Sequence, residues 1–415
     1  MREMKDSGLQ WAGDIPQYWN IAKGKHFMAV LERPVRDDDN VITCFRDGEV
    51  TLRSNRREDG FTVATVEAGY QGIEPGDLVV HGMDGFAGAI GISDSRGKGT
   101  PALNVLSCSE NKKYIMYLLR AMAYTEVFMA LSTGIRVRTC DTNWKKLKSL
   151  DYLIPPADEQ QCIADFLDAK CAEIDALNAD IQTQIDTLEQ YKRSVITETV
   201  TKGLNPNAEM KDSGIQWIGN MPAHWDVVRG KYILHYMQKP VREDDGVITC
   251  FRDGEVTLRS NRREEGFTMS DKEIGYQGID VGDLVVHGMD GFAGSIGISD
   301  SRGKASPVLN VLDTDQCKRY IMYYLRSMAY SDVFLALATG IRVRSCDLRW
   351  NKLAELSYPV PPLDEQNAIV KHIDSVLSKA DAVIADKEAQ LATLDEYKKS
   401  LIFEYVTGKK EVPVS

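Results

Sequence analysis

The chain repeats itself once, and this repeat limits its possible folds more than any other feature of the sequence. The tetrapeptide Lys-Asp-Ser-Gly at 5–8 recurs at 211–214, an offset of 206 residues. The same offset relates His81 to His287. A register that holds over about 200 residues predicts two copies of one folded unit and not a solenoid of short repeats.

The first part of each copy, residues 1–155 and 209–361, is predicted to be a domain of mixed α/β structure. Strand-like runs at 76–81 and 89–93 lie between Gly and Asp turns. A helical stretch rich in Met, Leu, Tyr and Ala follows at 113–131. The second copy is expected to fold in the same way.

A long helix is predicted to follow in each copy, over 156–208 and 362–415. Each begins at a Pro-Pro-x-Asp-Glu-Gln sequence, in which the prolines end the preceding element and Asp158 caps the first helix. Apolar residues then recur every seven positions, as in helices that pair along their length. About 40 residues make an arm of roughly 60 Å. The residues assigned to this helix–helix and partner interface are Leu167, Ile174, Ile181, Leu188, Val195, Ile373, Leu377, Ile384, Leu391, Leu394 and Leu401, with Leu177, Ile185 and Tyr191 in an alternate seam.

Together these features predict an α+β protein with two similar domains and two long helices that pack as an antiparallel coiled coil. Such packing would relate the two copies by an approximate two-fold axis, and the helices would act as a ruler. The alternative is an ordinary amphipathic helix on the surface of its own domain. The length of the helix and its recurrence in the second copy favour the coiled coil.

The net charge of −11 lies mainly in the helical segments. Residues 156–208 carry −6 and residues 362–415 carry −3, whereas residues 1–155 are neutral and residues 209–361 carry −2. Net charge therefore neither supports nor excludes a local basic surface for nucleic acid.

The sequence predicts a cytoplasmic protein without a membrane span, a metal site or a cofactor. No run approaches the ~18 to 20 uninterrupted apolar residues of a membrane span, and the first residues lack the apolar core of a signal peptide. The eight cysteines show no CxxC pair and no Cys/His cluster. Idle thiols in a reducing compartment fit this pattern.

Three motifs resemble the specificity subunits of type I restriction-modification systems. One is the Ser-Gly-x-Gln-Trp segment that opens each copy, at 7–19 and 213–225. The others are the Gly-Asp-Leu strand at 76–78 with Gly-Ala-Ile-Gly at 88–91, and the Pro-Pro-x-Asp-Glu-Gln junction before each helix. The resemblance covers essentially the whole chain, in order.

The resemblance implies a non-catalytic subunit with two target-recognition domains, each of which reads one half of a split site in double-stranded DNA. It also implies that the helices set the spacing and bind two adenine-methyltransferase subunits, with restriction and translocase subunits joining them. The residues agree, because the chain has neither the Asp/Asn-Pro-Pro-aromatic motif of adenine methyltransferases nor a GxxxxGK[ST] phosphate loop. No catalytic residue is predicted.

The two copies differ less than two recognition domains of this family usually do. The stretch 41–58 recurs unchanged at 247–264, and 76–88 recurs unchanged at 282–294. Nearly identical readers related by a two-fold axis should read nearly identical half-sites on opposite strands. We therefore expect the target to be an interrupted palindrome.

Arginine and asparagine side chains supply the candidate contacts to DNA, because Arg pairs with phosphate or guanine and Asn with adenine. They gather in the cluster at 53–57, in the alternating Arg-Val stretch at 133–138, and near the glycine-rich loop that begins at His81. The acidic turn at 37–39 is expected to be solvated and to face away from DNA. The candidate DNA-binding residues are Arg46, Arg53, Asn55, Arg56, Arg57, His81, Arg136, Arg138, Arg252, Arg259, Asn261, Arg262, Arg263, His287, Arg342 and Arg344.

Each candidate also has a structural alternative. The arginines of 53–57 could pair with Glu49, Glu58 and Asp59 at a solvated strand edge, and a lone histidine is more often packed or hydrogen-bonded. For the whole chain, the alternatives are a coiled-coil scaffold that does not touch DNA, or a specificity subunit that serves one fused methyltransferase-nuclease chain.

Overall fold

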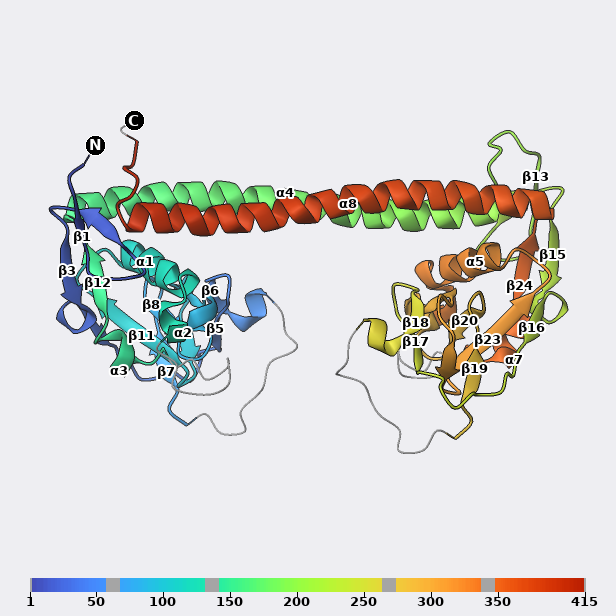
Figure 1. Cartoon of the computed structure of the whole chain (residues 1–415), viewed down its shortest axis with the longest axis horizontal. Helices are drawn as coiled ribbons and strands as arrows, with labels where there is room; N and C mark the ends of the chain where they lie inside the picture. The colour runs from blue at the N-terminus through green and yellow to red at the C-terminus, as the bar shows by residue number, and fades with distance from the viewer. Residues whose placement is uncertain (1, 57–67, 131–141, 263–273, 337–347, 414–415) are drawn as a thin grey trace. The chain divides into compact units, whose positions relative to one another are not determined.

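The structure, a computed structural model, describes residues 2–56, 68–130, 142–262, 274–336 and 348–413 (Figure 1). The chain forms two compact units. Unit 1 comprises Met1–Ile181 and Glu388–Ser415, and unit 2 comprises Gln182–Lys387. Each unit therefore combines the globular part of one copy with helical segments from both copies. The sequence-based division into four segments stays a prediction.

Unit 1 contains short strands and helices that follow one another in the order of the sequence. The strands are β1 (Met4–Asp6), β2 (Asp14–Pro16), β3 (Asn20–Lys23), β4 (Met28–Val30), β5 (Ile42–Cys44), β6 (Val50–Leu52), β7 (Gln71–Ile73), β8 (Leu78–His81), β9 (Ile90–Ile92), β10 (Gly97–Gly99), β11 (Leu103–Cys108) and β12 (Asp151–Ile154). The α-helices are α1 (Lys112–Tyr124), α2 (Val127–Ala130) and α3 (Trp144–Leu147), and the 3-10 helices are η1 (Gly24–His26), η2 (Arg53–Asn55) and η3 (Gly85–Ala87).

Unit 2 repeats this order of elements. Its strands are β13 (Met210–Asp212), β14 (Asn220–Pro222), β15 (Asp226–Arg229), β16 (Leu234–Tyr236), β17 (Ile248–Cys250), β18 (Val256–Leu258), β19 (Gln277–Ile279), β20 (Leu284–His287), β21 (Ile296–Ile298), β22 (Gly303–Ala305), β23 (Leu309–Thr314) and β24 (Ser357–Val360). Its helices are α5 (Lys318–Tyr330), α6 (Val333–Ala336), α7 (Trp350–Glu355), η5 (Gly230–Tyr232), η6 (Arg259–Asn261) and η7 (Gly291–Ala293). The two long helices are α4 (Ala157–Lys202) and α8 (Leu363–Val406).

An antiparallel four-stranded sheet forms the centre of each unit, in the order β4-β11-β8-β9 and β16-β23-β20-β21. Alternate side chains of β8 point to opposite faces, as the pleat of a strand requires. Leu78 and Val80 join the core cluster that contains α1, whereas Val79 joins the cluster that contains β5 and β6. The strands predicted at 76–81 and 89–93 are thus confirmed as β8 and β9, and both of their faces are buried.

The helical stretch predicted at 113–131 is two helices. The side chain of Asn111 accepts a hydrogen bond from the backbone N–H of Tyr114 and so caps α1. The helix ends at Tyr124, and Glu126 adopts a φ of 60° before α2 begins. A left-handed residue cannot continue a right-handed helix, so the chain turns at this point.

Each long helix starts one residue after the beginning of its predicted segment, at Ala157 and at Leu363. Helix α4 begins at Ala157, with Asp158 and Glu159 in its first turn, and the Pro156 carbonyl accepts from the backbone N–H of Gln160. The prediction that Asp158 caps the helix is therefore wrong, although acidic residues do occupy the first turn. The side-chain amide of Gln160 instead fixes the junction, since it donates to the Pro155 carbonyl and its oxygen accepts from the Asn111 N–H.

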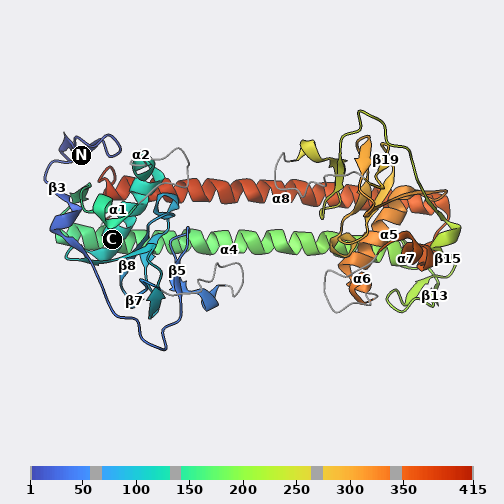
Figure 2. The same ribbon diagram turned by 90° about the horizontal axis from the view of Figure 1, so that it is seen from below.

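Within each unit the segments of α4 and α8 run antiparallel (Figures 1 and 2). In unit 1 the rings of Phe166 and Tyr405 pack with their centroids 4.5 Å apart, and Lys398 Nζ lies 2.6 Å from an Asp175 carboxylate oxygen. In unit 2 Lys192 pairs with Asp381 at 2.6 Å. The predicted α+β class, with two similar domains and two long helices, is confirmed.

The residues predicted at the helix interface differ in how deeply they are buried. Leu177 and Tyr191 are exposed, so their assignment to a second buried seam is wrong, whereas Ile185 is buried. Two paired helices bury only a narrow stripe of each, and a flanking stripe stays in solvent. Leu167, Ile174, Ile373, Ile384 and Leu401 are buried, and Ile181, Leu188, Val195, Leu377, Leu391 and Leu394 are half-buried.

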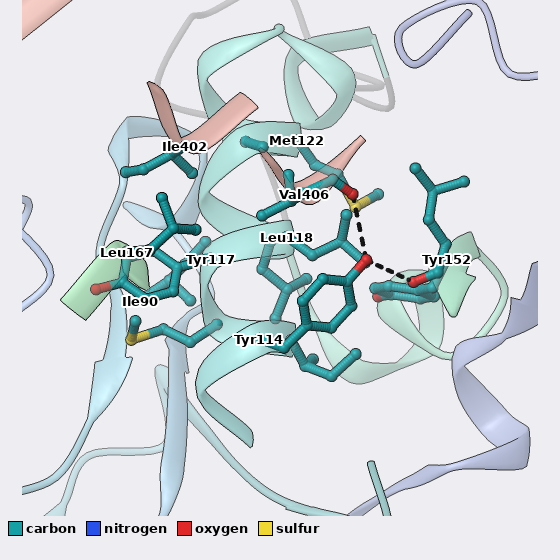
Figure 3. Close-up of a cluster of buried hydrophobic side chains, with 14 of the residues drawn as sticks. Ile90, Tyr114, Tyr117, Leu118, Met122, Tyr152, Leu167, Ile402 and Val406 are labelled. Carbon is teal, nitrogen blue, oxygen red and sulfur yellow. Dashed lines mark hydrogen bonds between the residues drawn. The ribbon is translucent and has the colours of Figure 1, made fainter. Parts of the chain in front are cut away.

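The ends of the long helices also pack onto the globular part of their unit. Leu167, Ile174 and Leu401 belong to the same buried cluster as α1. In that cluster the hydroxyl of Tyr114 donates to the carbonyls of Leu153, at 3.1 Å, and Val406, at 3.2 Å (Figure 3). The long helices therefore pair with each other and also pack onto a globular part, so both arrangements considered from the sequence occur together.

A buried arginine connects α1 to the turn between β5 and β6. Arg120 Nε donates to the Ile90 carbonyl at 2.8 Å, and Arg120 Nη2 donates to the Gly48 carbonyl at 3.0 Å. Gly48 has a φ of 89°, and a Cβ atom there would overlap the Arg120 guanidinium. The glycine is therefore required both by its backbone conformation and by the space that the arginine occupies.

This double requirement predicts the stabilities of two pairs of alanine substitutions. Gly48→Ala with its counterpart Gly254→Ala should destabilise each unit by about 3 kcal/mol, because it combines left-handed strain with displacement of a buried hydrogen-bonding group. Gly76→Ala with Gly282→Ala is the matched control, since both glycines have positive φ but open space around the Cβ position. The control should cost about 1 kcal/mol per unit. Urea denaturation followed by circular dichroism measures both, and equal losses would contradict the role of the arginine.

Candidate functional site

Six residues near the β5–β6 turn, together with the last residue of β8 and one residue of the loop that follows it, line a recess of about 580 Å³ in unit 1. They are Thr43, Cys44, Phe45, Arg46, Asp47, Arg56, His81 and Asp84. Every one of these residues is identical in the second copy, at an offset of 206. We call this group the recess residues. Five of them combine hydrogen-bond donors and acceptors within one hollow: Arg46, Arg56, His81, Asp47 and Asp84.

Both arginines of the recess face carboxylates of the same unit. Arg56 Nη1 lies 2.5 Å from Asp47 and 3.2 Å from Glu49, and its Cζ lies 4.4 Å from the ring centroid of Phe45. Arg46 Nη2 lies 2.8 Å from Asp84. The ion pair with Glu49 is one that the structural alternative for this cluster anticipated.

The same pairs recur in unit 2 with nearly equal distances. Arg262 lies 2.6 Å from Asp253 and 4.3 Å from the ring centroid of Phe251. Arg252 lies 3.1 Å from Asp290. The guanidinium groups are thus held in place before any ligand arrives, and they remain on the surface, where the Arg46 side chain is 67% exposed.

Arg53 and Asn55 brace the hairpin next to the recess. Arg53 Nε donates to Thr43 Oγ1 at 3.0 Å, and Asn55 Nδ2 donates to the hydroxyl of the buried Thr51 at 2.8 Å. Arg259 and Asn261 make the same two bonds in unit 2, to Thr249 and Thr257. In each unit the arginine and the asparagine therefore stabilise the hairpin whose turn carries Arg46 or Arg252.

His81 fixes the loop that follows β8. Its Nδ1 accepts hydrogen bonds from the backbone N–H groups of Met83, at 3.2 Å, and Asp84, at 3.1 Å. Burial lowers the pKa of His81, although Asp84 opposes this, so the neutral ring is favoured. Because Nδ1 accepts, the neutral ring carries its proton on Nε2. His287 makes the same two bonds and its pKa is lowered for the same reason.

The acidic turn at 37–39 is only partly solvated. Asp39 is buried, and its carboxylate accepts from Arg96 at 2.9 Å and from the Arg36 backbone N–H at 2.8 Å. The bonds from Arg96 lower the pKa of Asp39. The prediction of a fully solvated turn is wrong for Asp39, because its partner lies 57 residues away in the sequence.

Several predicted site residues lie outside the described residues. They are Arg57, Arg136, Arg138, Arg263, Arg342 and Arg344. The other candidates meet at or beside the recess residues. All DNA-binding assignments stay predictions.

Sequence analysis missed the other recess residues, above all Phe45, Asp47 and Asp84. Each lies in a stretch that is unchanged between the two copies, and this identity was the signal that could have found them. Cys44 is also part of the recess, but burial raises the pKa of its thiol to about 12, which keeps it protonated.

In the part of the chain that the structure describes, no helix combines the length and apolar character needed to cross a membrane. No three His, Cys, Asp or Glu side chains in those ranges come together as a metal site.

Known proteins with similar sequences carry closely related names. No protein-family model matches the sequence. The "Putative type I restriction enzyme MjaX specificity subunit" of Methanocaldococcus jannaschii is 24% identical, over 96% of this chain and 95% of that protein. The "Type I restriction enzyme StySPI specificity subunit" of Salmonella potsdam is 19% identical, over 96% of this chain and 90% of that protein.

A solved structure shares the fold. It is described under "Structural basis underlying complex assembly and conformational transition of the type I R-M system", and its chain is 13% identical. The match covers 95% of this chain and 99% of that chain, with a TM-score of 0.66. Over nearly its whole length the chain is therefore similar in sequence to proteins named as specificity subunits of type I restriction enzymes, the family that its motifs resemble, and it shares its fold with a chain of a type I restriction-modification system.

Proposed function

We propose that the chain is the DNA-reading specificity subunit of a type I restriction-modification complex, and that other chains carry out the chemistry. The observation that carries this proposal is the set of recess residues, which is present in both copies without a single substitution. The names of the relatives support the same role.

The recess residues match the hydrogen-bonding groups of base edges. An arginine fork can donate to guanine or to a phosphate, and a carboxylate can accept from the amino group of cytosine. Arg46 with Asp84, and Arg56 with Asp47, offer one group of each kind side by side. On binding, at least one of the two arginines would exchange its carboxylate partner for a base or a phosphate.

The two units should read the same half-site. The recess residues are identical, whereas the surrounding domain has diverged, for example from Lys113 to Arg319 and from Tyr18 to His224. Because α4 and α8 run antiparallel within each unit, we propose that the half-sites are read on opposite strands. The target is then an interrupted palindrome, with the helices setting the spacer.

Mapping of methylated adenines tests this function. The chain is co-expressed with the methyltransferase encoded beside it, and single-molecule sequencing locates the modified bases. A split inverted repeat methylated in both half-sites is expected. Replacing one arginine of each recess, Arg46→Ala with Arg252→Ala, should reduce methylation at that site at least tenfold, because a bidentate base contact contributes about 1–3 kcal/mol.

The matched control removes an exposed, ion-paired cation outside the recess. Lys23 pairs with Asp151 and Arg229 with Glu355 at equivalent places in the two units. Lys23→Ala with Arg229→Ala should leave the methylated site unchanged. A split site with unrelated halves would refute the palindrome only. An active methyltransferase without any preferred site would instead favour the coiled-coil scaffold.

The exposed stripe of the long helices fits the docking of methyltransferase subunits. Leu177 and Tyr397 are 51% and 54% exposed in unit 1, and Tyr191 and Val383 are 51% and 44% exposed in unit 2. The Asp175–Lys398 ion pair places the first two at a similar level of the helix pair. Each unit therefore presents an aromatic and an aliphatic side chain at equivalent positions of its helix pair, which suits one partner per unit.

Removing one of these surfaces should release one partner. Leu177→Asp with Tyr397→Asp is expected to change the complex from two methyltransferase subunits per chain to one, because the altered surface lies in unit 1 alone. Native mass spectrometry measures this ratio. Ala172→Asp, an exposed position on another side of α4, is the control and should keep two. An unchanged ratio in the double variant would place docking elsewhere.

A further inference from the structure

An apolar side chain stands in solvent beside the recess of unit 1, and its counterpart in unit 2 is exposed as well. Met83 is 58% exposed and its counterpart Met289 is 56% exposed. Met83 lies in the chain between two recess residues, His81 and Asp84. Covering a methionine removes apolar surface from water, so this side chain can contribute to binding when a ligand occupies the recess beside it.

The loop that carries Met83 is held firmly by hydrogen bonds. The backbone N–H of Met83 donates to His81 Nδ1. The Asp84 carbonyl accepts from the N–H groups of Ala87, at 2.9 Å, and Ala89, at 3.2 Å. The Gly82 N–H donates to the Ala102 carbonyl at 2.6 Å. The exposure of Met83 is therefore a fixed presentation of the side chain and not the result of a loose loop.

The corresponding loop of unit 2 is held in the same way. The Met289 N–H donates to His287 Nδ1 at 3.2 Å, and the Gly288 N–H donates to the Val308 carbonyl at 2.7 Å. The residues that support the loop have changed, since Ala102 corresponds to Val308, but the exposed methionine has not. The exposed methionine is thus the same in both copies, although the residue whose carbonyl holds the loop differs.

We propose that Met83 and Met289 each contact the C5 methyl group of a thymine in the major groove of their half-site. The inference rests on the proposed function and names one of its specificity-determining contacts. The recess residues beside each methionine are donors and acceptors, and only the major groove carries a pattern of donors and acceptors that is unique for each base pair. The thymine methyl is the apolar group of that groove. A flexible, polarisable methionine suits contact with it.

In this arrangement His81 is a positioning residue. Two backbone N–H groups occupy its Nδ1, so its main task is to orient the loop and the methionine at its tip. Asp84 serves both the loop and the ion pair with Arg46, which keeps the polar and apolar contacts in a fixed relation.

Replacing thymine with deoxyuridine tests the contact, because the exchange removes only the methyl group. The chain with its methyltransferase partner is titrated against target duplexes that carry deoxyuridine at one thymine at a time. At one thymine per half-site, the natural protein should bind about fourfold more weakly, the effect of uncovering one methyl group. Met83→Ala with Met289→Ala should bind the all-thymine target more weakly by a similar factor per half-site and show no further loss with deoxyuridine.

A second pair of exposed methionines, at equivalent positions of the two units, provides the control. Met4 and Met210 are 40% and 39% exposed and lie in β1 and β13, away from the recess residues in the fold. Met4→Ala with Met210→Ala should keep the full deoxyuridine effect. The proposal is overturned if the natural protein is insensitive to deoxyuridine at every position, or if the Met83/Met289 variant keeps the same sensitivity. A weaker-binding variant with unchanged deoxyuridine sensitivity and reduced bending of the duplex would point to a wedge between base steps instead. Failure of the natural complex to prefer any sequence would overturn the proposed function itself.

Discussion

The hydroxyl group of one buried tyrosine in each unit holds the fold together. Tyr114 in unit 1 and Tyr320 in unit 2 lie on the helix that covers the central sheet, and each donates to a strand carbonyl and to the last turn of a long helix. Burial raises the pKa of both tyrosines well above the ordinary value, so the hydroxyl remains a donor. The helix end that accepts belongs to the other copy of the repeat. Neither globular part is therefore complete within its own half of the sequence.

A buried arginine connects the helix that bears this tyrosine to the recess at the surface. Arg120 extends from α1 through the edge of the sheet to the carbonyl of Gly48, in the turn that bears Arg46 and Asp47. The position of the recess is thus tied, through one side chain, to the helix that the tyrosine anchors. In unit 2 Arg326 donates to the Ile296 carbonyl, the counterpart of the bond from Arg120 to Ile90. A buried arginine with bonds to backbone carbonyls fixes geometry more strictly than apolar packing does, because each bond has a preferred direction.

Local patterns in the sequence were sufficient for the repeat, the strands β8 and β9, and the long helices. The strands are runs of strand-forming residues between Gly and Asp turns, the helices have a seven-residue apolar period, and the repeat can be read directly. The failures share one cause, which is dependence on distant residues. Asp39 is buried because Arg96 faces it, and Leu177 is exposed because the paired helix covers another side of α4. Phe45 and Asp84 joined the recess only when the fold brought the β5–β6 turn and the end of β8 together. The arginine cluster could be found by composition, but the carboxylates that hold it could not.

The internal ion pairs of the recess have a consequence for how such a protein would find its target. An arginine that already faces a carboxylate gains little from an arbitrary phosphate, because it must give up one ion pair to form another. If the chain reads DNA as proposed, its attraction to random DNA would be correspondingly weak and its residence there short. Only a base sequence that also offers hydrogen-bond donors to the released carboxylates would recover the free energy lost with the ion pairs. The acidic partners of Arg46 and Arg56 would then favour quick release from wrong sites over tight binding everywhere.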